Sequence, residues 1–233
     1  MPRSNCLNLI ACILLVGSLS MSEAARSATH DIVNLGELAA AALGVDEPYF
    51  GHAYDINEAG QIVGDWADNA FFYDPVTGIN VRPFFPATVG NSYFSGLNNL
   101  GLAVGLATGN IMGKVVYDYN TNTYMGVGER ISLYPDIDDS GAIIERSRTE
   151  MLAEYTGPTD LFALLPTNPG WDSLTPVAMN SSGQIVGWGK LTDHYSPDNF
   201  AFLMNPIPIP PAVWLFGTGL VGLISLAKRR AQS

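Results

Sequence analysis

The sequence predicts an all-β protein made of four repeats of about 41 residues, arranged as a small, four-bladed, β-propeller-like ring. One short phrase recurs four times at nearly constant spacing, as in repeat architectures. Short apolar runs bounded by turn residues fill the intervals, and no segment after Ala42 carries a sustained 3.6-residue period. A signal peptide is expected before this domain, and a membrane-spanning helix after it.

Residues 1–24 are typical of a secretory signal peptide. Arg3 precedes a mostly apolar stretch from 7 to 19, and Ser22-Glu23-Ala24 offers a small-x-small cleavage site. Cys6 and Cys12 both fall inside this segment. The exported chain is therefore expected to form no disulfide and no thiolate metal site.

The recurring phrase defines the expected domain, residues 25–206. It reads AYDINEAGQIVG at 53–64, FSGLNNLGLAVG at 94–105, YPDIDDSGAIIE at 134–145 and PVAMNSSGQIVG at 176–187. Its glycines are spaced by 41, 40 and 42 residues. The third copy ends in Glu145 where the other copies have glycine, so it is expected to pack differently.

Each phrase has the sequence of a tight turn between two strands. A side-chain oxygen at the first position accepts from the backbone, and glycine three residues later takes the positive φ that closes the turn. This geometry gives a hairpin with a bulged glycine. The predicted turn residues are Asn57, Gly60, Asn98, Gly101, Asp138, Gly141, Asn180 and Gly183.

Further strands are expected after each phrase. The second apolar runs are 70–73, 115–117, 161–165 and 200–204, and third extended pieces follow at 78–85 and 124–131. Repeat four stops before a third strand, whereas 31–36 is a strand with no phrase before it. We therefore expect 31–36 to complete the last repeat and close the ring, which removes an exposed sheet edge. A short helical turn is expected at 37–43.

Charge and motifs exclude several function classes. The body from 25 to 206 has seven basic and twenty-one acidic residues, a balance of −14, which disfavours nucleic acid and anionic lipid as partners. His30, His52 and His194 are far apart in sequence, and no catalytic or phosphate-binding motif is present. Residues 136–147 resemble a calcium loop only at their start, because Ser147 occupies the position of the last ligand. No catalytic residue, metal or cofactor is expected.

Two tryptophans are candidate ligand contacts. Trp66 and Trp188 follow the first and last phrases at near-equivalent positions, in or near expected loops, where an indole could stack on a sugar ring. The alternative is that the aromatic residues belong to the core. Asp65 and Asp68 are interpreted as a solvated loop rather than a ligand pair.

Residues 207–233 combine a proline cluster, sixteen uncharged residues at 212–227 and a basic triplet. A helix over 212–227 would be roughly 24 Å long and would leave the triplet in the cytoplasm. The segment resembles the C-terminal sorting signal of PEP-CTERM proteins, in the variant with Val-Pro-Leu-Pro-Ala. The residues that carry this resemblance are Pro208, Pro210, Pro211, Ala212, Trp214, Phe216, Gly217, Gly219, Gly222, Lys228, Arg229 and Arg230. Ile209 stands where the namesake motif has Glu, and Pro211 where Ala is usual.

The PEP-CTERM resemblance implies recognition and processing by an exosortase, a membrane-embedded cysteine peptidase, with transient anchoring in the inner membrane. The alternative is a plain membrane anchor. The phrases themselves resemble the extracellular HAF repeat, with 33–36, 56–64 and Asn69-Ala70-Phe71 matching its three parts. That resemblance implies a secreted protein of no established chemistry.

Together these features predict an exported, non-enzymatic protein of the cell surface or biofilm matrix that binds exopolysaccharide or a surface protein. The alternative is a carbohydrate-active enzyme on a propeller scaffold, which needs paired carboxylates at catalytic distance.

Overall fold

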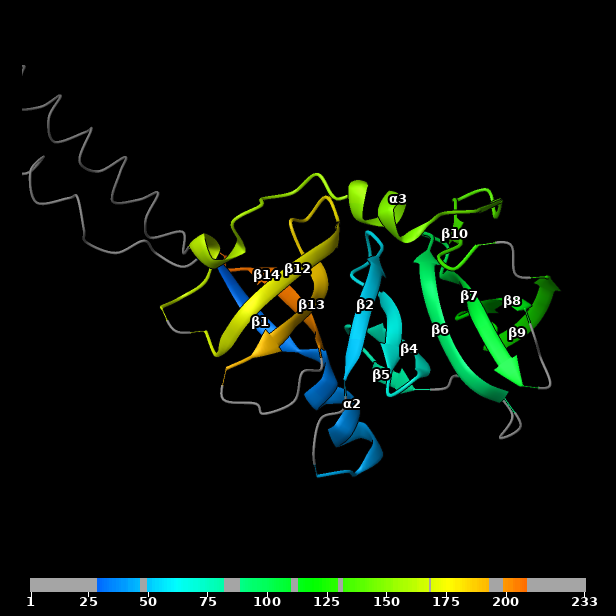
Figure 1. The fold of residues 1–233 in the computed structure, drawn as a ribbon, viewed down its shortest axis with the longest axis horizontal. Coiled ribbons are helices and arrows are strands. Elements are labelled where there is room, and N and C mark those ends of the chain that lie inside the picture. The colour runs from blue at the N-terminus through cyan, green and yellow to red at the C-terminus, as the bar shows by residue number, and fades with distance from the viewer. Residues whose placement is uncertain are drawn as a thin grey trace, which may run out of the picture.

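Four antiparallel sheets, one for each repeat, make up most of the part of the chain that the computed structural model describes (Figure 1). That part comprises residues 29–46, 50–81, 89–109, 113–129, 132–167, 169–192 and 199–208. Within these ranges, two short α-helices and one 3-10 helix accompany the strands. The prediction of an all-β protein is confirmed.

Units one and two each form a four-stranded meander. Unit one consists of β2 (Gly51–Ile56), β3 (Ile62–Trp66), β4 (Asn69–Asp74) and β5 (Gly78–Val81). Unit two consists of β6 (Val89–Leu97), β7 (Leu102–Gly109), β8 (Gly113–Asp118) and β9 (Thr123–Gly128). In both units the strands pair in the order in which they follow along the chain.

The fourth strand of unit four comes from the N-terminal part of the chain, before unit one. Its strands are β12 (Trp171–Met179), β13 (Ile185–Leu191) and β14 (Phe200–Pro206), and β1 (His30–Asn34) pairs antiparallel with β14. Ile32 of β1 lies opposite Met204. The prediction that the N-terminal strand completes the last unit is confirmed. The helix expected at 37–43 is α2 (Leu35–Leu43), which begins at the cap Asn34 and ends at Gly44 with φ +68°.

Unit three has only a two-stranded hairpin. It consists of β10 (Asp136–Ile137) and β11 (Ile143–Ile144), followed by α3 (Arg148–Ala153) and the 3-10 helix η1 (Leu161–Leu164). The prediction of a strand at 161–165 is wrong. Asp160 caps the 3-10 turn by accepting from the N–H of Ala163, and Leu161 and Leu165 are buried against unit four.

Helix α3 was not expected from the hydrophobic pattern. It begins with a capping box in which Ser147 accepts from the Glu150 N–H and the Glu150 carboxylate accepts from the Ser147 N–H. Met151 is its buried anchor, beside Tyr54, Val177 and Trp188. In Figure 1 the helix lies across the top of the molecule, above β2 and β6.

The four turns have the predicted chemistry. Gly60, Gly101, Gly141 and Gly183 have φ of +76°, +78°, +85° and +80°. In each of these turns, the glycine N–H donates to the carbonyl of the asparagine or aspartate three residues before it. The side-chain oxygen of that residue also accepts from backbone N–H groups of its own turn, as at Asn57 from Ala59 and Gln61.

Hydrogen bonds between turns join the units in the order four, one, two, three. The side-chain amide of Asn180 donates to the Asn57 carbonyl at 3.1 Å, Asn57 donates to the Asn98 carbonyl at 3.1 Å, and Asn98 donates to the Asp138 carbonyl at 2.9 Å. The three amides are buried. Asp138 has a carboxylate in place of the amide, so its side chain has no N–H to continue the series.

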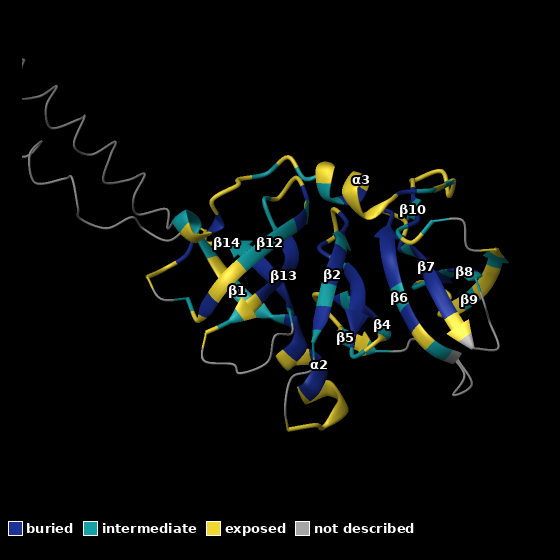
Figure 2. Ribbon diagram, viewed as in Figure 1, coloured by how far each residue is buried: buried dark blue, intermediate teal, exposed yellow. Residues whose placement is uncertain are grey.

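The core lies mainly between neighbouring sheets (Figure 2). One cluster joins units four and one with α2 and includes Leu35, Ile62 and Val186. A second joins units one and two, where Phe72 stacks on Tyr119 at 4.5 Å. In Figure 1 the sheets of units four, one and two stand side by side from left to right.

Two predicted segments lie outside the described residues: the signal peptide at 1–24 and the membrane helix at 212–227. Among the residues that the structure does describe, no helix is long and apolar enough to cross a bilayer.

Candidate functional site

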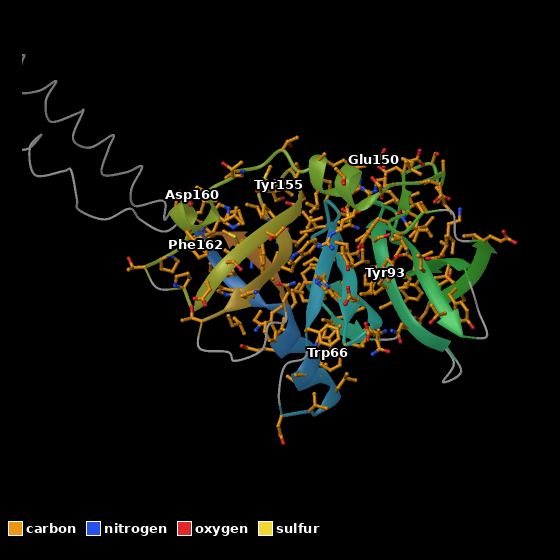
Figure 3. The ribbon with its side chains drawn as sticks, viewed as in Figure 1. Trp66, Tyr93, Glu150, Tyr155, Asp160 and Phe162 are labelled. Carbon is orange, nitrogen blue, oxygen red and sulfur yellow. The ribbon has the colours of Figure 1, made fainter. Side chains whose placement is uncertain are left out.

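Aromatic side chains from all four units meet at one place in the molecule. We call this group the central aromatic cluster: His52 and Tyr54 of unit one, Tyr93 of unit two, Tyr134 of unit three and Trp188 of unit four. Tyr54 lies at its middle, with ring centroids 5.9 Å from Tyr93, 5.7 Å from Tyr134 and 5.8 Å from Trp188. Figure 3 shows Tyr93 on β6, the first strand of unit two.

A β-bulge recurs just before three of the turns. The register shifts between Ala53 and Asp55 in β2, between Phe94 and Gly96 in β6, and between Pro176 and Ala178 in β12. The bulged residues Tyr54, Ser95 and Val177 all lie three positions before the turn asparagine. Bulges re-aim side chains, and here they turn these positions inward, where all three are buried.

Asp65 connects two members of the cluster. It lies opposite His52 across β2 and β3, and its Oδ1 is 3.1 Å from His52 Nδ1. Burial, and then the negative charge of Asp65, which also forms a side-chain hydrogen bond with Tyr54, raise the pKa of the Tyr54 hydroxyl far above its usual range. Tyr54 therefore stays a neutral hydrogen-bonding group at every physiological pH.

Arg148 places a positive charge at the edge of the cluster. Its guanidinium carbon lies 5.6 Å from the centroid of the Trp188 ring, within cation–π range, and its side chain is exposed on α3. The body around it is strongly acidic.

A cavity of about 480 Å³ borders the cluster beside Tyr93. Strand residues supply its apolar floor, and an amide, two hydroxyls and a carboxylate supply polar groups. The lining residues are Asn91, Tyr93, Leu106, Ala107, Thr108, Gly113 and Glu129. An aromatic ring beside a few amide, hydroxyl and carboxylate groups can bind a polyhydroxylated ligand such as a sugar.

A second group of charges lies between units one, two and three. Arg146 binds Asp136 at 3.1 Å, Glu154, and the Ser95 carbonyl at 3.0 Å. Nearby, Asp55 accepts from the Leu97 N–H, and burial together with Asp136 raises the pKa of Asp55 to about 7.

The two predicted ligand contacts lie apart. Trp188 belongs to the central aromatic cluster, whereas Trp66 packs in the core between units four and one. The residue of unit one that is equivalent to Trp188 is Asp65, not Trp66. Asp65 and Trp188 directly follow the first and last phrases, and they pair with His52 and Thr175, which directly precede those phrases. Both tryptophans are on strands and buried. Trp66 ends β3 beside the turn that follows, whereas Trp188 lies within β13, so the prediction of a position in or near a loop is wrong for Trp188.

The interpretation of Asp65 as a solvated loop residue is also wrong. It is a buried residue of β3. Asp68, three residues on, is exposed in the turn after β3 with φ +61°. Within the described ranges no three His, Cys, Asp or Glu side chains are grouped to hold a metal ion.

Sequence reasoning found Trp188 but missed the other members of the cluster, because the members do not share one repeat position. His52, Tyr54, Tyr93 and Tyr134 precede their turns by five, three, five and four residues, and Trp188 follows its own turn. Of the predicted sorting residues, Pro208 is exposed just after β14, and those from Pro210 onward lie outside the described residues.

No family model, no curated protein and no solved structure matches this chain. The site must therefore be interpreted from its own chemistry.

Proposed function

We propose that this chain is an exported, non-enzymatic protein of the cell surface or extracellular matrix that binds exopolysaccharide in the cavity beside Tyr93, at the edge of the central aromatic cluster. The observation that supports this most directly is the cavity of about 480 Å³ beside Tyr93, with amide, hydroxyl and carboxylate groups around an apolar floor. Sugar rings present apolar faces and many hydroxyls, which suits such a lining. The acidic body agrees with an uncharged or cationic polymer rather than an anionic one.

Binding of the host's own exopolysaccharide to the full chain tests this proposal. We expect Asn91→Ala and Thr108→Ala to weaken binding at least about tenfold in isothermal titration calorimetry, because each removes hydrogen-bonding capacity from the cavity. Thr121→Ala is the matched control, since Thr121 is an exposed hydroxyl on the turn after β8. Equal affinity in all three variants would contradict the assignment of the cavity.

We also propose that the four units follow one another around a propeller-like ring. The turn-to-turn hydrogen bonds that join units four, one, two and three support this arrangement, as does the pairing of β1 with β14. In a propeller the first strand of each unit is innermost, and the contacts of β2 with β12 and β6 agree with that placement.

Processing by an exosortase at residues 207–233 remains part of the proposal. Its support is the order of the proline cluster, the apolar run and the basic triplet. Intact mass of the protein from its native host decides it: loss of the segment after Pro206 supports sorting, whereas a full-length C-terminus retained in the membrane supports a plain anchor.

The alternative, a carbohydrate-active enzyme, is favoured by one observation. Asp55 and Asp136 are neighbouring carboxylates, and a carboxyl group whose pKa is raised to about 7 has the property of a general acid. Their contacts, however, are to backbone N–H groups and Arg146. Glycan turnover that is lost in both Asp55→Asn and Asp136→Asn would favour the enzyme.

A further inference from the structure

Unit three leaves open a position that a strand fills in each of the other units. We propose that this position is a binding site for an extended strand of a partner protein, which adds antiparallel to β11. The inference goes beyond polysaccharide binding, because it concerns a different surface and a different class of partner.

One residue of the second strand is buried in the complete units but exposed in unit three, where the described residues place no third strand beside it. The residue three positions after the turn glycine is Val63, Val104 or Val186 in units one, two and four, and each is 0% exposed. Its equivalent in unit three, Ile144, is 46% exposed. In the three complete units a third strand covers this residue, with Phe72, Val116 and Leu203 directly opposite.

A groove lies where the missing strand would pack. It has a volume of about 340 Å³ and separates hairpin β10–β11 from the face of unit two that turns away from unit one. Ile137 and Ile143 line one side, and Leu102, Val116 and Met125 line the other. Met125 is 63% exposed, which is a large exposure for an apolar side chain on a strand.

The complete units also indicate which side chain the groove accepts. The residue opposite Ile143 corresponds to Tyr73, Tyr117 and Met204. Tyr117 packs edge-on against Phe72 of the preceding unit, with ring centroids 5.9 Å apart. Val116 is the unit-two equivalent of Phe72 and lines the groove, so an incoming tyrosine or methionine would meet it there.

Glu145 occupies the next position of unit three, where the other units have glycine. Its carboxylate is already bound by the Lys114 ammonium and by the N–H and hydroxyl of Ser132. Glu145 therefore does not select the partner residue opposite it. The net charge of −11 favours a basic partner over a second copy of this chain.

A labelled peptide tests the site. The probe is an eight-residue peptide with valine and tyrosine at the positions expected opposite Ile144 and Ile143 and a lysine at each end, and its binding to the full chain is measured by fluorescence anisotropy. We expect saturable binding with Kd below about 100 μM, and at least about tenfold weaker binding when serine replaces the tyrosine. Hydrogen exchange should show protection of 143–145 in the complex.

Variants of the chain complete the test. Ile144→Asp and Met125→Asp should each weaken binding at least about tenfold, because a carboxylate would have to be buried under the peptide. Val76→Asp is the matched control, since Val76 is 90% exposed in the turn between β4 and β5. Circular dichroism checks that each variant folds.

Three outcomes would overturn the proposal: no saturable binding to the parent chain, equal affinity for the serine peptide, or unchanged affinity in Ile144→Asp. A sedimentation measurement could give a fourth such outcome. Self-association of the parent that is lost in Ile144→Asp would assign the edge to a second copy of this chain instead.

Discussion

At the scale of single residues, the turn asparagines serve two purposes. The Oδ1 atom of Asn98 accepts from the N–H groups of Leu100 and Leu102 and so closes its own turn. Its Nδ2 group donates to the Asp138 carbonyl of the next unit. Aspartate can do the first but not the second, as Asp138 itself illustrates.

The substitution Asn98→Asp therefore isolates the bond between units. We expect it to lower the free energy of unfolding by about 1–3 kcal/mol, because the Asp138 carbonyl loses a buried donor and a charge is buried instead. Asp138→Asn, at an exposed side chain, should change stability by less than about 0.5 kcal/mol. Urea denaturation measures both variants. If they proved equally stable, the bond between turns would contribute nothing.

Asp55 gives the stability a pH dependence. Its pKa is raised to about 7 in the folded chain, from the usual 3.8. Between these two values the folded chain holds a proton that the unfolded chain has released, so the free energy of unfolding falls as pH rises from about 4 to 7. Asp74 and Asp118 have lowered pKa values in the folded chain, so their ionised carboxylates stabilise it. This contribution to the free energy of unfolding is lost only as pH falls below about 4 and the carboxylates are protonated.

The variant Asp55→Asn removes this contribution. We expect the difference in free energy of unfolding between pH 4.5 and pH 8 to shrink by more than about 1 kcal/mol relative to the parent chain. Denaturation curves at a series of pH values measure it. An unchanged slope would mean that Asp55 titrates normally in the folded protein.

Sequence reasoning reached the turn residues but, of the central aromatic cluster, only Trp188. A glycine with positive φ after Asn or Asp is a local signal, and the four copies repeat it. The inward orientation of Tyr54 depends on a bulge, which is a feature of pairing between strands and leaves no mark in the sequence that we could identify.

At the scale of whole elements, the pairing of β1 with β14 is the clearest case for a test. The two strands face each other over five residue pairs, from His30 with Pro206 to Asn34 with Phe202. Ile32 also packs against the core cluster around Phe202. We expect deletion of 31–36 to lower Tm strongly, by more than about 10 °C, because unit four loses its outer strand and β14 becomes an open edge. An unchanged Tm would refute this role.

Helix α3 follows the hairpin of unit three and packs against the central aromatic cluster. Met151 is 1% exposed and lies against Tyr54, Val177 and Trp188. Met151→Ala should therefore destabilise the protein by about 2–4 kcal/mol, because it leaves a cavity beside the central aromatic cluster. Thr149→Ala, at an exposed position of the same helix, should change stability by less than about 0.5 kcal/mol. Similar losses in both variants would show that Met151 is not an anchor.

In unit three the repeat pattern predicted the hairpin but not the structure that follows it. The phrase at 134–145 correctly indicated a hairpin, and Glu145 correctly indicated that this copy packs differently. The run 161–165 has the composition of a strand, yet it forms a 3-10 turn because Asp160 caps it and its leucines find a core on unit four. The capping box at Ser147 and Glu150 was the one local signal that could have predicted α3.

At the scale of the whole molecule, the units differ in how completely they are buried. Units one, two and four each have four strands, and the equivalent valines of their second strands, Val63, Val104 and Val186, are 0% exposed. Unit three has two short strands, and one face of its hairpin borders an open groove. Stability is therefore expected to be uneven, with unit three opening before the rest.

Native-state hydrogen exchange tests this expectation. Amides of Ile62 and Val63 in β3 should exchange only through global unfolding, because both side chains are 0% exposed within a four-stranded sheet. The equivalent amides of Ile143 and Ile144 should exchange through local opening, at a free energy several kcal/mol lower. Equal protection at the two sites would mean that unit three is as firmly held as unit one. It would then lack the open edge that a partner strand requires.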